Sequence, residues 1–530
     1  MARNEYFIGV DVGSASVRAG VFDAAGNRVG FATRPISQHR PRADFVEQSS
    51  SEIWERACGA VKEAVARAGI GAEQVRALGY DATCSLVAVD ERGRGVSVSE
   101  TAEPEHDIIM WMDHRAGEEQ AEINATNDDA LRYVGGQVSV EMELPKILWL
   151  KRRLPERYLR TWRFFDLADY LVWRATGRDV AGGCALTCKW NYLAHEGRFS
   201  EMLLSAVGLT DVLTKIPQTV LKLGEKAGHI TAETAERCGL TTDVVVASGI
   251  IDAHAGGLAL VGGHPEGRLA VISGTSNCHM IVSRQPIPVP GVWGPYWEAM
   301  LPDWWLNEGG QSAAGALVEW TIRQGDAWPA LQAEAARREC SVYAVLNEWT
   351  ADLERREPFP TRRLHVLGDH HGNRSPRANP RALGAIYGLT LEEGADALAR
   401  LYLATLQAVA YGTRHVIDAM REAGHRISHL SLCGGATKNP LWVREYANVT
   451  GCDIQLAADE DVVTLGAAVL GAAACGRFAS LPEAVTAMAH SGGAVVADPS
   501  CRAFHDAKYR VYLQMYDDLQ RAEREMRCVY

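Results

Sequence analysis

Three short turns rich in glycine and hydroxyl side chains each follow an apolar run. They span residues 11–16, 273–277 and 434–439. The backbone amides of such a turn can point inward and hold a phosphate group. Since the same residue types are also common in hairpin turns, one turn alone would not indicate a phosphate site. Three of them in one chain predict a nucleotide held between two halves of the molecule.

Asp252 is the single residue best placed for catalysis. It follows an apolar run, and no cation lies close to it in the sequence. A carboxylate in such a place can accept a proton from a reacting hydroxyl, or it can cap the helix that starts at Ala253, and both alternatives stay open. Asp11, in the first turn, is either a turn residue or an oxygen ligand for the Mg²⁺ of a bound nucleotide.

The cysteines give only weak support for a zinc site. Cys184 and Cys188 are one helical turn apart, but no histidine or further cysteine pair accompanies them in the sequence. The twelve cysteines form no C-x-x-C pair, which is typical of reduced and mostly buried thiols. We therefore expect a cytoplasmic protein.

The sequence lacks the common motifs of several other classes of enzyme and nucleotide-binding protein. The sequence contains no Walker phosphate loop, no G-x-G-x-x-G after a strand, no H-E-x-x-H and no G-x-S-x-G. With 54 Lys and Arg against 66 Asp and Glu, the net charge is −12, which argues against binding nucleic acid or an anionic membrane. The N-terminal segment has charges where a signal peptide needs an apolar core, and no stretch is long enough to span a membrane. The expected partners are small molecules.

Strand and helix patterns alternate along the chain and must position these residues. Strands are predicted at 7–10, 17–22, 28–33, 75–79, 86–89 and 242–248, and a helix at 53–69. This alternation predicts an α/β fold. The length of 530 residues is enough for more than one domain.

An internal repeat indicates two similar halves. Residues 8–17 return in outline at 269–277, so that Gly13 corresponds to Gly274 and Ser14 to Thr275. The match is short, and chance recurrence is the alternative. Further on we expect a long helix at 397–420, a small-residue helix at 462–475 suited to close packing, a less regular insertion at 324–376, and a charged surface helix at 502–527.

With these turns, the sequence resembles the FGGY carbohydrate kinases over nearly its whole length. Residues 11–18 and 273–276 resemble the two phosphate loops of the family, and 434–439 its adenosine loop. Residues 142–150 and 384–407 resemble the two family signatures. Five further segments are most similar to the ribulokinase branch of the family: 81–87, 111–116, 188–190, 307–312 and 371–376. Within the first of these, the run at 83–87 is most similar to the D-ribulokinases.

The resemblance implies a fold, a division and a set of site residues. The implied fold has two actin-like, ribonuclease-H-like α/β domains with a cleft between them, here at 1–262 and 263–530. Asp252 resembles the catalytic base and Asp11 the carboxylate near Mg²⁺. The implied sugar-binding residues are Thr83, Trp111, Lys189, Asp252 and Glu308. The implied nucleotide-binding residues are Gly13, Ser14, Ser16, Arg18, Gly274, Thr275, Ser276, Gly310, Gln311, Gly434, Gly435, Ala436 and Asn439.

Simpler interpretations stand beside these roles. Trp111 could be a core tryptophan, Lys189 a surface cation and Glu308 a charge at a helix entry. Lys146 and Trp149 fit an ordinary helix face with a snorkelling lysine and are left out of the site.

The expected activity is transfer of the γ-phosphoryl group of MgATP to the terminal hydroxyl of a ketopentose, D-ribulose giving D-ribulose 5-phosphate. The alternatives within the family are L-ribulose, ribitol, D-xylulose and glycerol. The alternative of another class is a non-catalytic, actin-like ATP-binding switch. The sequence leaves the oligomeric state open, a homodimer included.

Overall fold

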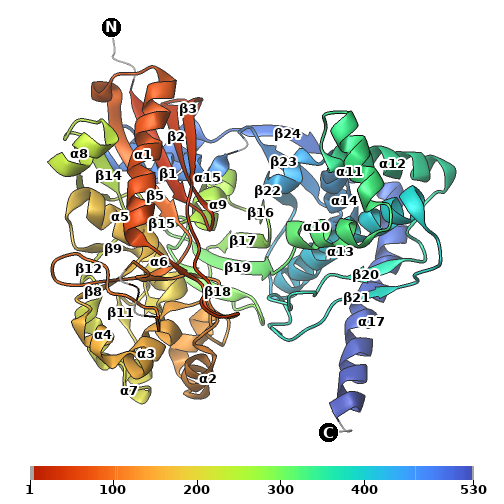
Figure 1. Cartoon of the computed structure of the whole chain (residues 1–530), viewed down its shortest axis with the longest axis horizontal. Helices are drawn as coiled ribbons and strands as arrows, with labels where there is room; N and C mark the ends of the chain where they lie inside the picture. The colour runs from red at the N-terminus through yellow and green to blue at the C-terminus, as the bar shows by residue number, and fades with distance from the viewer. Residues whose placement is uncertain (1–4, 102, 104, 460, 528–530) are drawn as a thin grey trace.

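Two seven-stranded sheets form the framework of the computed structural model, which describes residues 5–101, 103, 105–459 and 461–527 (Figure 1). The first sheet has the order β13-β14-β5-β1-β2-β3, with β15 paired to β5. Its strands are β1 (Tyr6–Val12), β2 (Ser16–Asp23), β3 (Arg28–Pro35), β5 (Val75–Ala82), β13 (Lys226–His229), β14 (Val245–Ala247) and β15 (Ile250–Ile251).

The second sheet has the order β18-β19-β17-β16-β22-β23-β24. Its strands are β16 (Arg268–Ser273), β17 (Asn277–Ser283), β18 (Trp293–Trp297), β19 (Trp305–Gln311), β22 (His429–Gly434), β23 (Asp453–Ala457) and β24 (Ser491–Val495). A smaller sheet joins β4 (Glu47–Gln48), β7 (Ile108–Ile109), β6 (Leu86–Val89) and β8 (Arg163–Asp166).

The two large sheets share one five-strand topology. In the first, β3-β2-β1 are antiparallel neighbours, and β5 and β14 continue in parallel with β1. In the second, β19-β17-β16 and then β22 and β23 repeat the same order and the same directions. This equivalence confirms the prediction of two similar halves, and β1 corresponds to β16 as the repeat at Gly13 and Gly274 indicated.

Helices cover both sheets. Those of the first half begin with α1 (Ser50–Ala68), which has Ser49 as its N-cap and ends at Gly69 with φ 65°. The others are α2 (Gly117–Ala125), α3 (Glu143–Arg153), α4 (Pro155–Arg160), α5 (Leu167–Thr176), α6 (Gly183–Lys189), α7 (Glu201–Ala206), α8 (Ala232–Cys238) and α9 (Asp252–Val261). Those of the second half are α10 (Gly315–Gln324), α11 (Trp328–Arg337), α12 (Val342–Arg356), α13 (Gly394–Glu422), α14 (Pro440–Thr450), α15 (Val462–Ala474), α16 (Leu481–Met488) and α17 (Arg502–Arg527).

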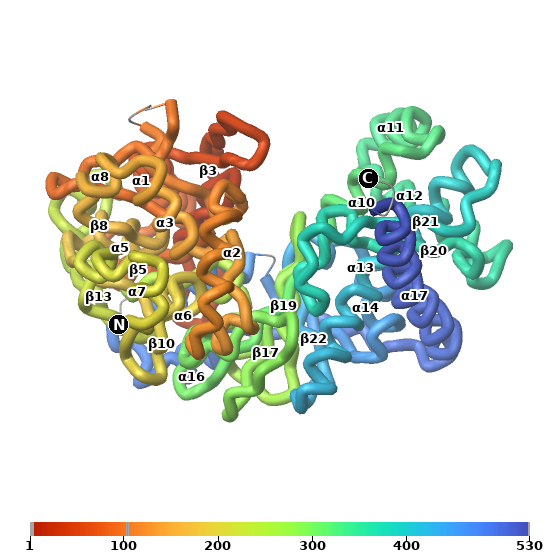
Figure 2. The backbone as a smooth tube through the Cα atoms, turned by 90° about the horizontal axis from the view of Figure 1, so that it is seen from below, coloured from red at the N-terminus to blue at the C-terminus, as the bar shows by residue number. Residues whose placement is uncertain are grey.

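The small-residue helix α15 packs closely against its neighbours, as its composition predicted, and it joins the two halves. It packs on β1 and β5 of the first sheet and on α9, although it lies far along the sequence (Figure 1). A Cβ added to Gly9 of β1 would lie 1.7 Å from the carbonyl oxygen of Thr464, and one added to Gly466 would lie 2.0 Å from that of Ala255. Seen from below in Figure 2, α16 also lies on the side of the first half, and its buried residues belong to the same core as Phe7.

Two expectations for the second half were wrong. Segment 324–376 is not an irregular insertion throughout, because α11 and α12 occupy much of it and bury Leu331 and Leu346. The charged helix α17 is not simply a surface tail. Tyr512 and Met515 are buried, and they pack into the second core with α13 and α14. Its charges mark the outer face of an amphipathic helix.

The described part of the chain contains only free cysteines, and the buried ones include Cys58, Cys184 and Cys188. This agrees with the prediction of reduced thiols. Among the described residues, no helix is long and apolar enough to cross a membrane.

Candidate active site

Two buried carboxylates lie side by side at the ends of parallel strands. Asp11 near the end of β1 is in register with Asp81 of β5, and both side chains are fully buried. Arg18 Nε donates to Asp11 Oδ2 at 2.6 Å, which leaves Asp11 Oδ1 and both oxygens of Asp81 without a hydrogen-bond partner. Burial, together with the charges of Asp11 and Asp252, raises the pKa of Asp81 well above its ordinary value.

This carboxylate group fits a divalent cation. Buried oxygens without partners are costly, and carboxylate oxygens completed by water are the ligands that Mg²⁺ prefers. Asp11 was predicted for this role. Asp81 lies in the family-like segment 81–87, and the sequence alone does not indicate this role for it, because Asp11 lies seventy positions away.

Asp252 completes the group as the first residue of α9. The N-cap is Ile251, and Asp252 Oδ1 accepts a hydrogen bond from the next amide, Ala253 N, at 2.6 Å. The simple N-cap alternative is therefore wrong. Burial and the nearby charge of Asp11 raise the pKa of Asp252 to about 6.

The first two turns are similar but differ in length, because four residues join the paired Val12 and Val17 and three join the paired Ser273 and Asn277. Gly13 N donates to Ser16 O at 3.0 Å, and Gly274 N donates to Ser276 O at 2.9 Å. Ser14 and Thr275 lie at the tips of these turns. Ser14 is fixed from three sides, because Trp111 Nε1 donates to its hydroxyl at 3.0 Å and Gln38 and Gln48 donate to its carbonyl oxygen.

The third turn lies beside the second. Gly434, which ends β22, is in register with Ser273, which ends β16. Gly434 has φ 91°, and a Cβ there would lie 2.4 Å from Ser273 O, so this position requires glycine. Gly435 and Ala436 begin the short 3₁₀ helix Gly435–Lys438, and Ala436 is buried.

Two of the predicted nucleotide residues have side chains that are already engaged. Asn439 caps α14 by accepting from Trp442 N, and its Nδ2 donates to Tyr402 Oη at 2.6 Å. Gln311 donates to Val409 O and accepts from Asn277 and Thr413. Both side chains hold the second half together. At Gly310 Arg374 leaves no room for a side chain, because its Cδ lies 2.6 Å from the position of an added Cβ.

Arg18 connects the first turn to the second half of the sequence. Besides its bond to Asp11, its Nη1 lies 3.4 Å from Oδ2 of Asp461, which precedes α15. Arg18 therefore neutralises carboxylates at the junction.

Lys189 and Glu308 form a buried ion pair. Lys189 Nζ at the end of α6 lies 3.7 Å from Glu308 Oε2 in β19, and both side chains are less than 10% exposed. Burial alone would raise the pKa of Glu308, but Lys189 and a hydrogen bond with His254 lower it to about 2. The interpretations of Lys189 as a surface cation and of Glu308 as a helix-entry charge are wrong.

Aromatic rings and a further ion pair surround Lys189. Its Nζ lies 4.3 Å from the ring centroid of Trp293, and the guanidinium of Arg374 lies 5.5 Å from the same ring. Arg374 also lies 5.9 Å from the Trp111 ring and pairs with Glu141 at 3.3 Å. Trp111 is half-buried here and is not an ordinary core residue.

Thr83 lies just beyond β5 and is buried. Its amide donates to Val12 O at 2.9 Å, and its hydroxyl bonds to that of Ser85, which in turn accepts from Trp111 N. The structure thus brings Thr83 to the carboxylate strands and to Trp111.

Sequence reasoning missed Glu141, Trp293 and Arg374. Only Arg374 carried a signal, within the family-like segment 371–376.

Lys146 is not a snorkelling lysine. It is fully buried in α3, where its Nζ donates to Glu141 O at 3.0 Å and lies 3.4 Å from Glu143 Oε1. Lys146 thereby anchors the backbone of Glu141, the partner of Arg374.

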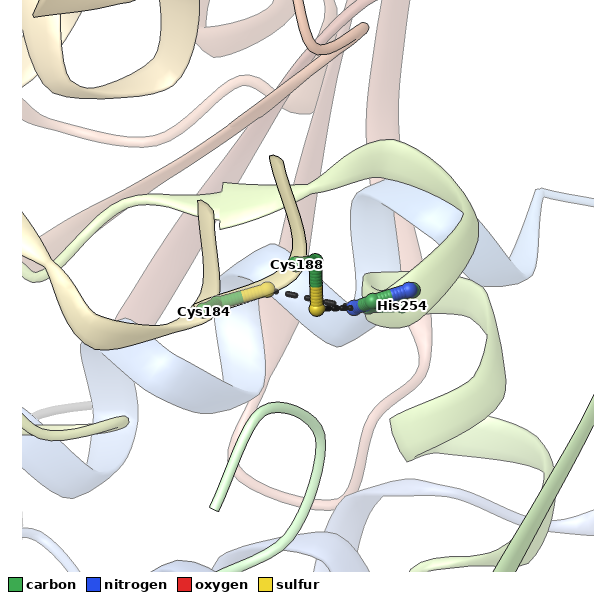
Figure 3. A group of neighbouring side chains, drawn as sticks. All are labelled: Cys184, Cys188 and His254. Atoms are coloured by element: carbon green, nitrogen blue, oxygen red, sulfur yellow. Dashed lines mark hydrogen bonds between the residues drawn. The ribbon is translucent and has the colours of Figure 1, made fainter. Parts of the chain in front are cut away.

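Behind Glu308 lies a cluster of two thiols and one imidazole. Figure 3 shows Cys184 and Cys188 of α6 facing His254 of α9. His254 Nδ1 lies 3.2 Å from Cys184 Sγ and 3.9 Å from Cys188 Sγ, and His254 Nε2 lies 3.2 Å from Glu308 Oε2. The histidine that the sequence did not place beside the cysteines is thus supplied by the helix that begins with Asp252.

Comparison with known proteins gives consistent matches for both halves. Residues 6–259 match the model of the FGGY family of carbohydrate kinases, N-terminal domain, and residues 269–475 match that of the C-terminal domain. The boundary expected at 262/263 stays a prediction.

Relatives match over most of the chain. An FGGY carbohydrate kinase domain-containing protein of Homo sapiens is 44% identical over 532 residues, covering 97% of this chain and 96% of that protein. A D-ribulokinase of Saccharomyces cerevisiae is 38% identical over 518 residues, covering 89% and 72%. The crystal structure of a xylulose kinase from Rhodospirillum rubrum superposes with a TM-score of 0.80 at 24% identity, covering 97% and 99%. The fold is therefore that of two actin-like α/β domains, as expected.

Proposed function

Because the chain belongs to the FGGY family of carbohydrate kinases and is a sugar kinase, we propose that it phosphorylates D-ribulose with ATP to give D-ribulose 5-phosphate. The similarity to the yeast D-ribulokinase over most of the chain carries the choice of substrate. The family membership also favours a catalytic kinase over the alternative of a non-catalytic ATP-binding switch.

Asp252 is the proposed general base. Its carboxylate begins α9 beside Asp11 and Asp81, and it accepts the proton of the terminal hydroxyl as that oxygen forms its bond to the γ-phosphorus. The bond between the γ-phosphorus and the β,γ-bridging oxygen breaks, and ADP leaves. Transfer of this kind passes through a loose transition state, so positioning and charge stabilisation dominate catalysis.

The turns at Gly13 and Gly274 are the proposed phosphate contacts. Their tips carry backbone amides and the hydroxyls of Ser14 and Thr275, which suit phosphate oxygens. Asp11, with Asp81 beside it, would hold Mg²⁺, which supplies charge neutralisation for the phosphates. Gly434, Gly435 and Ala436 line the proposed adenosine side of the site. Asn439 acts there by capping α14, and Gln311 by holding β19 to α13.

The sugar is proposed to bind beside Lys189 and Glu308. A fixed cation and a fixed carboxylate can donate to the keto oxygen and accept from hydroxyl groups, and burial in a dry site strengthens both interactions. Trp111 and Trp293 offer ring faces, and Arg374 adds a second fixed donor. Thr83 contributes next to Trp111.

A substrate panel tests this proposal. Release of ADP is measured at steady state with D-ribulose, L-ribulose, ribitol, D-xylulose and glycerol, each over a range of concentrations. D-Ribulose is expected to give the highest kcat/KM, and the product is identified as the 5-phosphate by NMR. If another compound of the panel gave a higher kcat/KM, that compound and not D-ribulose would be the preferred substrate. The assignment as a sugar kinase would be unaffected.

A further inference from the structure

The phosphoryl transfer proposed above uses none of the side chains of Cys184, Cys188 and His254 directly, and we propose that this cluster binds one Zn²⁺ ion. All three side chains are buried, and their ligand atoms lie within 4.8 Å of one another. The inference does not depend on which sugar the enzyme phosphorylates.

The spacing of the donor atoms suits a tetrahedral zinc site. Zn–S bonds of about 2.3 Å and Zn–N bonds of about 2.0–2.1 Å at tetrahedral angles place sulfur and nitrogen about 3.5 Å apart. The two Sγ to Nδ1 distances, 3.2 and 3.9 Å, lie on either side of this value. Figure 3 shows both sulfurs on the same side of the imidazole, at its Nδ1 edge. The three protein ligands leave a fourth position for a small ligand such as water.

The remaining nitrogen of His254 already has the partner that a metal-bound histidine requires. Histidine ligands generally donate their other ring N–H to a carboxylate or carbonyl, which fixes the tautomer and the ring orientation. Glu308 Oε2 lies 3.2 Å from His254 Nε2. With Nε2–H donating to Glu308, the lone pair of Nδ1 is free to bind an ion that lies between Nδ1 and the two sulfurs.

Charge balance also favours zinc in this buried place. Binding of Zn²⁺ releases the protons of the two thiols, and two thiolates neutralise the ion completely. The site therefore adds no net charge next to Lys189 and Glu308, whose charges already balance each other. A hard cation such as Mg²⁺ would not be held here, because thiolates are soft ligands.

The ion would tie together the two helices that carry the active-site residues. Lys189 directly follows Cys188 at the end of α6, and His254 lies two residues after Asp252 at the start of α9. Zinc would fix α6 to α9 and so fix the sugar-binding cation relative to the general base.

A second group of potential ligands, His39, Glu47 and His106, serves as a comparison. Its ligand atoms also lie within 4.8 Å of one another. However, the two imidazole rings are stacked 4.1 Å apart at 18°, so one ion cannot lie near both ring planes without rotation of a ring. Variants of this group therefore provide matched controls for zinc content.

Zinc content of the full chain, purified without a histidine tag and dialysed against a weak chelator, is measured by plasma mass spectrometry. One zinc per chain is expected for the unmodified protein and for His39→Gln, and less than a tenth of this for Cys188→Ser. An absence of zinc, one copper in its place, or loss of zinc in His39→Gln with retention in Cys188→Ser would overturn the proposal.

Cobalt substitution tests the ligands without relying on a variant that folds. Co²⁺ added to the zinc-depleted protein should give intense near-ultraviolet absorption from thiolate charge transfer and visible bands of a tetrahedral ion, reversed by one equivalent of Zn²⁺. A pale octahedral spectrum would contradict thiolate ligation. Because this readout requires neither sugar nor ATP, its failure is separate from a failure of the proposed D-ribulose activity.

Discussion

Lys189 and Glu308 form a buried ion pair that joins the two halves of the molecule. Lys189 ends α6 in the first half and Glu308 lies in β19 of the second, and Nζ and Oε2 are 3.7 Å apart. A buried pair of this kind gains little stability over apolar residues, but loss of one partner leaves an unpaired buried charge. The pair therefore suits a role in binding polar substrate groups and in aligning the two halves.

Loss of either charge should damage sugar binding. Glu308→Gln is expected to raise the sugar KM or lower kcat/KM at least tenfold, with binding of a non-hydrolysable ATP analogue changed less than threefold. The measurements are steady-state kinetics and calorimetry. Glu308→Gln also leaves Lys189 unpaired, and we expect about 3–5 kcal/mol of destabilisation, part of which the double variant with Lys189→Met recovers. If the variant instead lost most of its affinity for the ATP analogue, the pair would be assigned to the nucleotide-binding part of the site.

Asp252→Asn should abolish turnover and leave ATP binding largely intact. The amide keeps the shape of the carboxylate but cannot accept the proton, and general-base catalysis typically contributes ~10²–10⁴-fold. Single-turnover phosphorylation and ATP-analogue affinity are compared with those of the unmodified enzyme. Near-normal turnover by Asp252→Asn would remove the base assignment.

The sequence predicted local features of the framework better than contacts between distant segments. The strands that precede Gly13 and Gly274 have their own apolar patterns, so the repeat and the shared topology of the halves could be predicted. His254 and Cys184 are seventy positions apart, and only packing of α9 against α6 brings them together. In the same way, the pairing of Asp81 with Asp11 follows from parallel strand register, which no motif records.

Charge patterns misled where a helix is amphipathic. The charged residues of α17 indicated a surface helix, but its inner face carries Tyr512 and Met515. Lysine was also misjudged twice, since Lys146 and Lys189 are both buried and paired. A buried lysine requires a carboxylate or carbonyl partner. Glu308, the partner of Lys189, comes from a distant segment, whereas Lys146 has its partners at Glu141 and Glu143, and only its burial could not be read from the local sequence.

Substitution of Gly9 tests the packing of α15 on the first sheet. The Cβ of Gly9→Ala would lie 1.7 Å from Thr464 O, a backbone atom that cannot move without shifting α15. We expect a loss of at least about 1–3 kcal/mol of unfolding free energy. Gly117→Ala is the matched control, because an added Cβ there meets nothing within 4 Å. Equal stability of the two variants in urea denaturation would contradict this packing.

Lys508 should make stability depend on pH. Its Nζ donates to Thr361 O and Leu364 O at 2.6 Å, and burial lowers the pKa of the amine to about 7. Between pH 7 and the ordinary lysine pKa of about 10.4, the unfolded chain binds a proton that the folded chain lacks. The unfolding free energy contributed by Lys508 therefore rises with pH over this range and falls as the pH drops towards 7.

Lys508→Met removes this titration. The variant should show a flatter dependence of the urea midpoint on pH between 7 and 10 than the unmodified chain. Lys62→Met, at an exposed lysine of α1, is the control and should keep the original slope. The same slope in all three proteins would exclude Lys508 as the source.

The two halves should approach each other when both substrates bind. The turn at Gly13 belongs to the first half and the turns at Gly274 and Gly434 to the second, so ATP can contact all three only between the halves. Closure would bring a sugar held near Lys189 to the γ-phosphate and exclude water that would otherwise be phosphorylated. D-Ribulose plus a non-hydrolysable ATP analogue should therefore reduce the radius of gyration beyond the effect of either ligand alone.

Hydrogen exchange locates the same change. Amides of the turns at Gly13 and Gly274 should gain protection with both ligands, whereas those of the outer helix α11 should not change and serve as the internal control. The rate of ATP hydrolysis to free phosphate should be lower with bound D-ribulose than without sugar, because the closed site leaves little room for water. Identical scattering dimensions and unchanged exchange in the free and doubly liganded enzyme would exclude closure, and would mean that the carboxylates, the turns and the Lys189–Glu308 pair form a rigid site already in place before substrates bind.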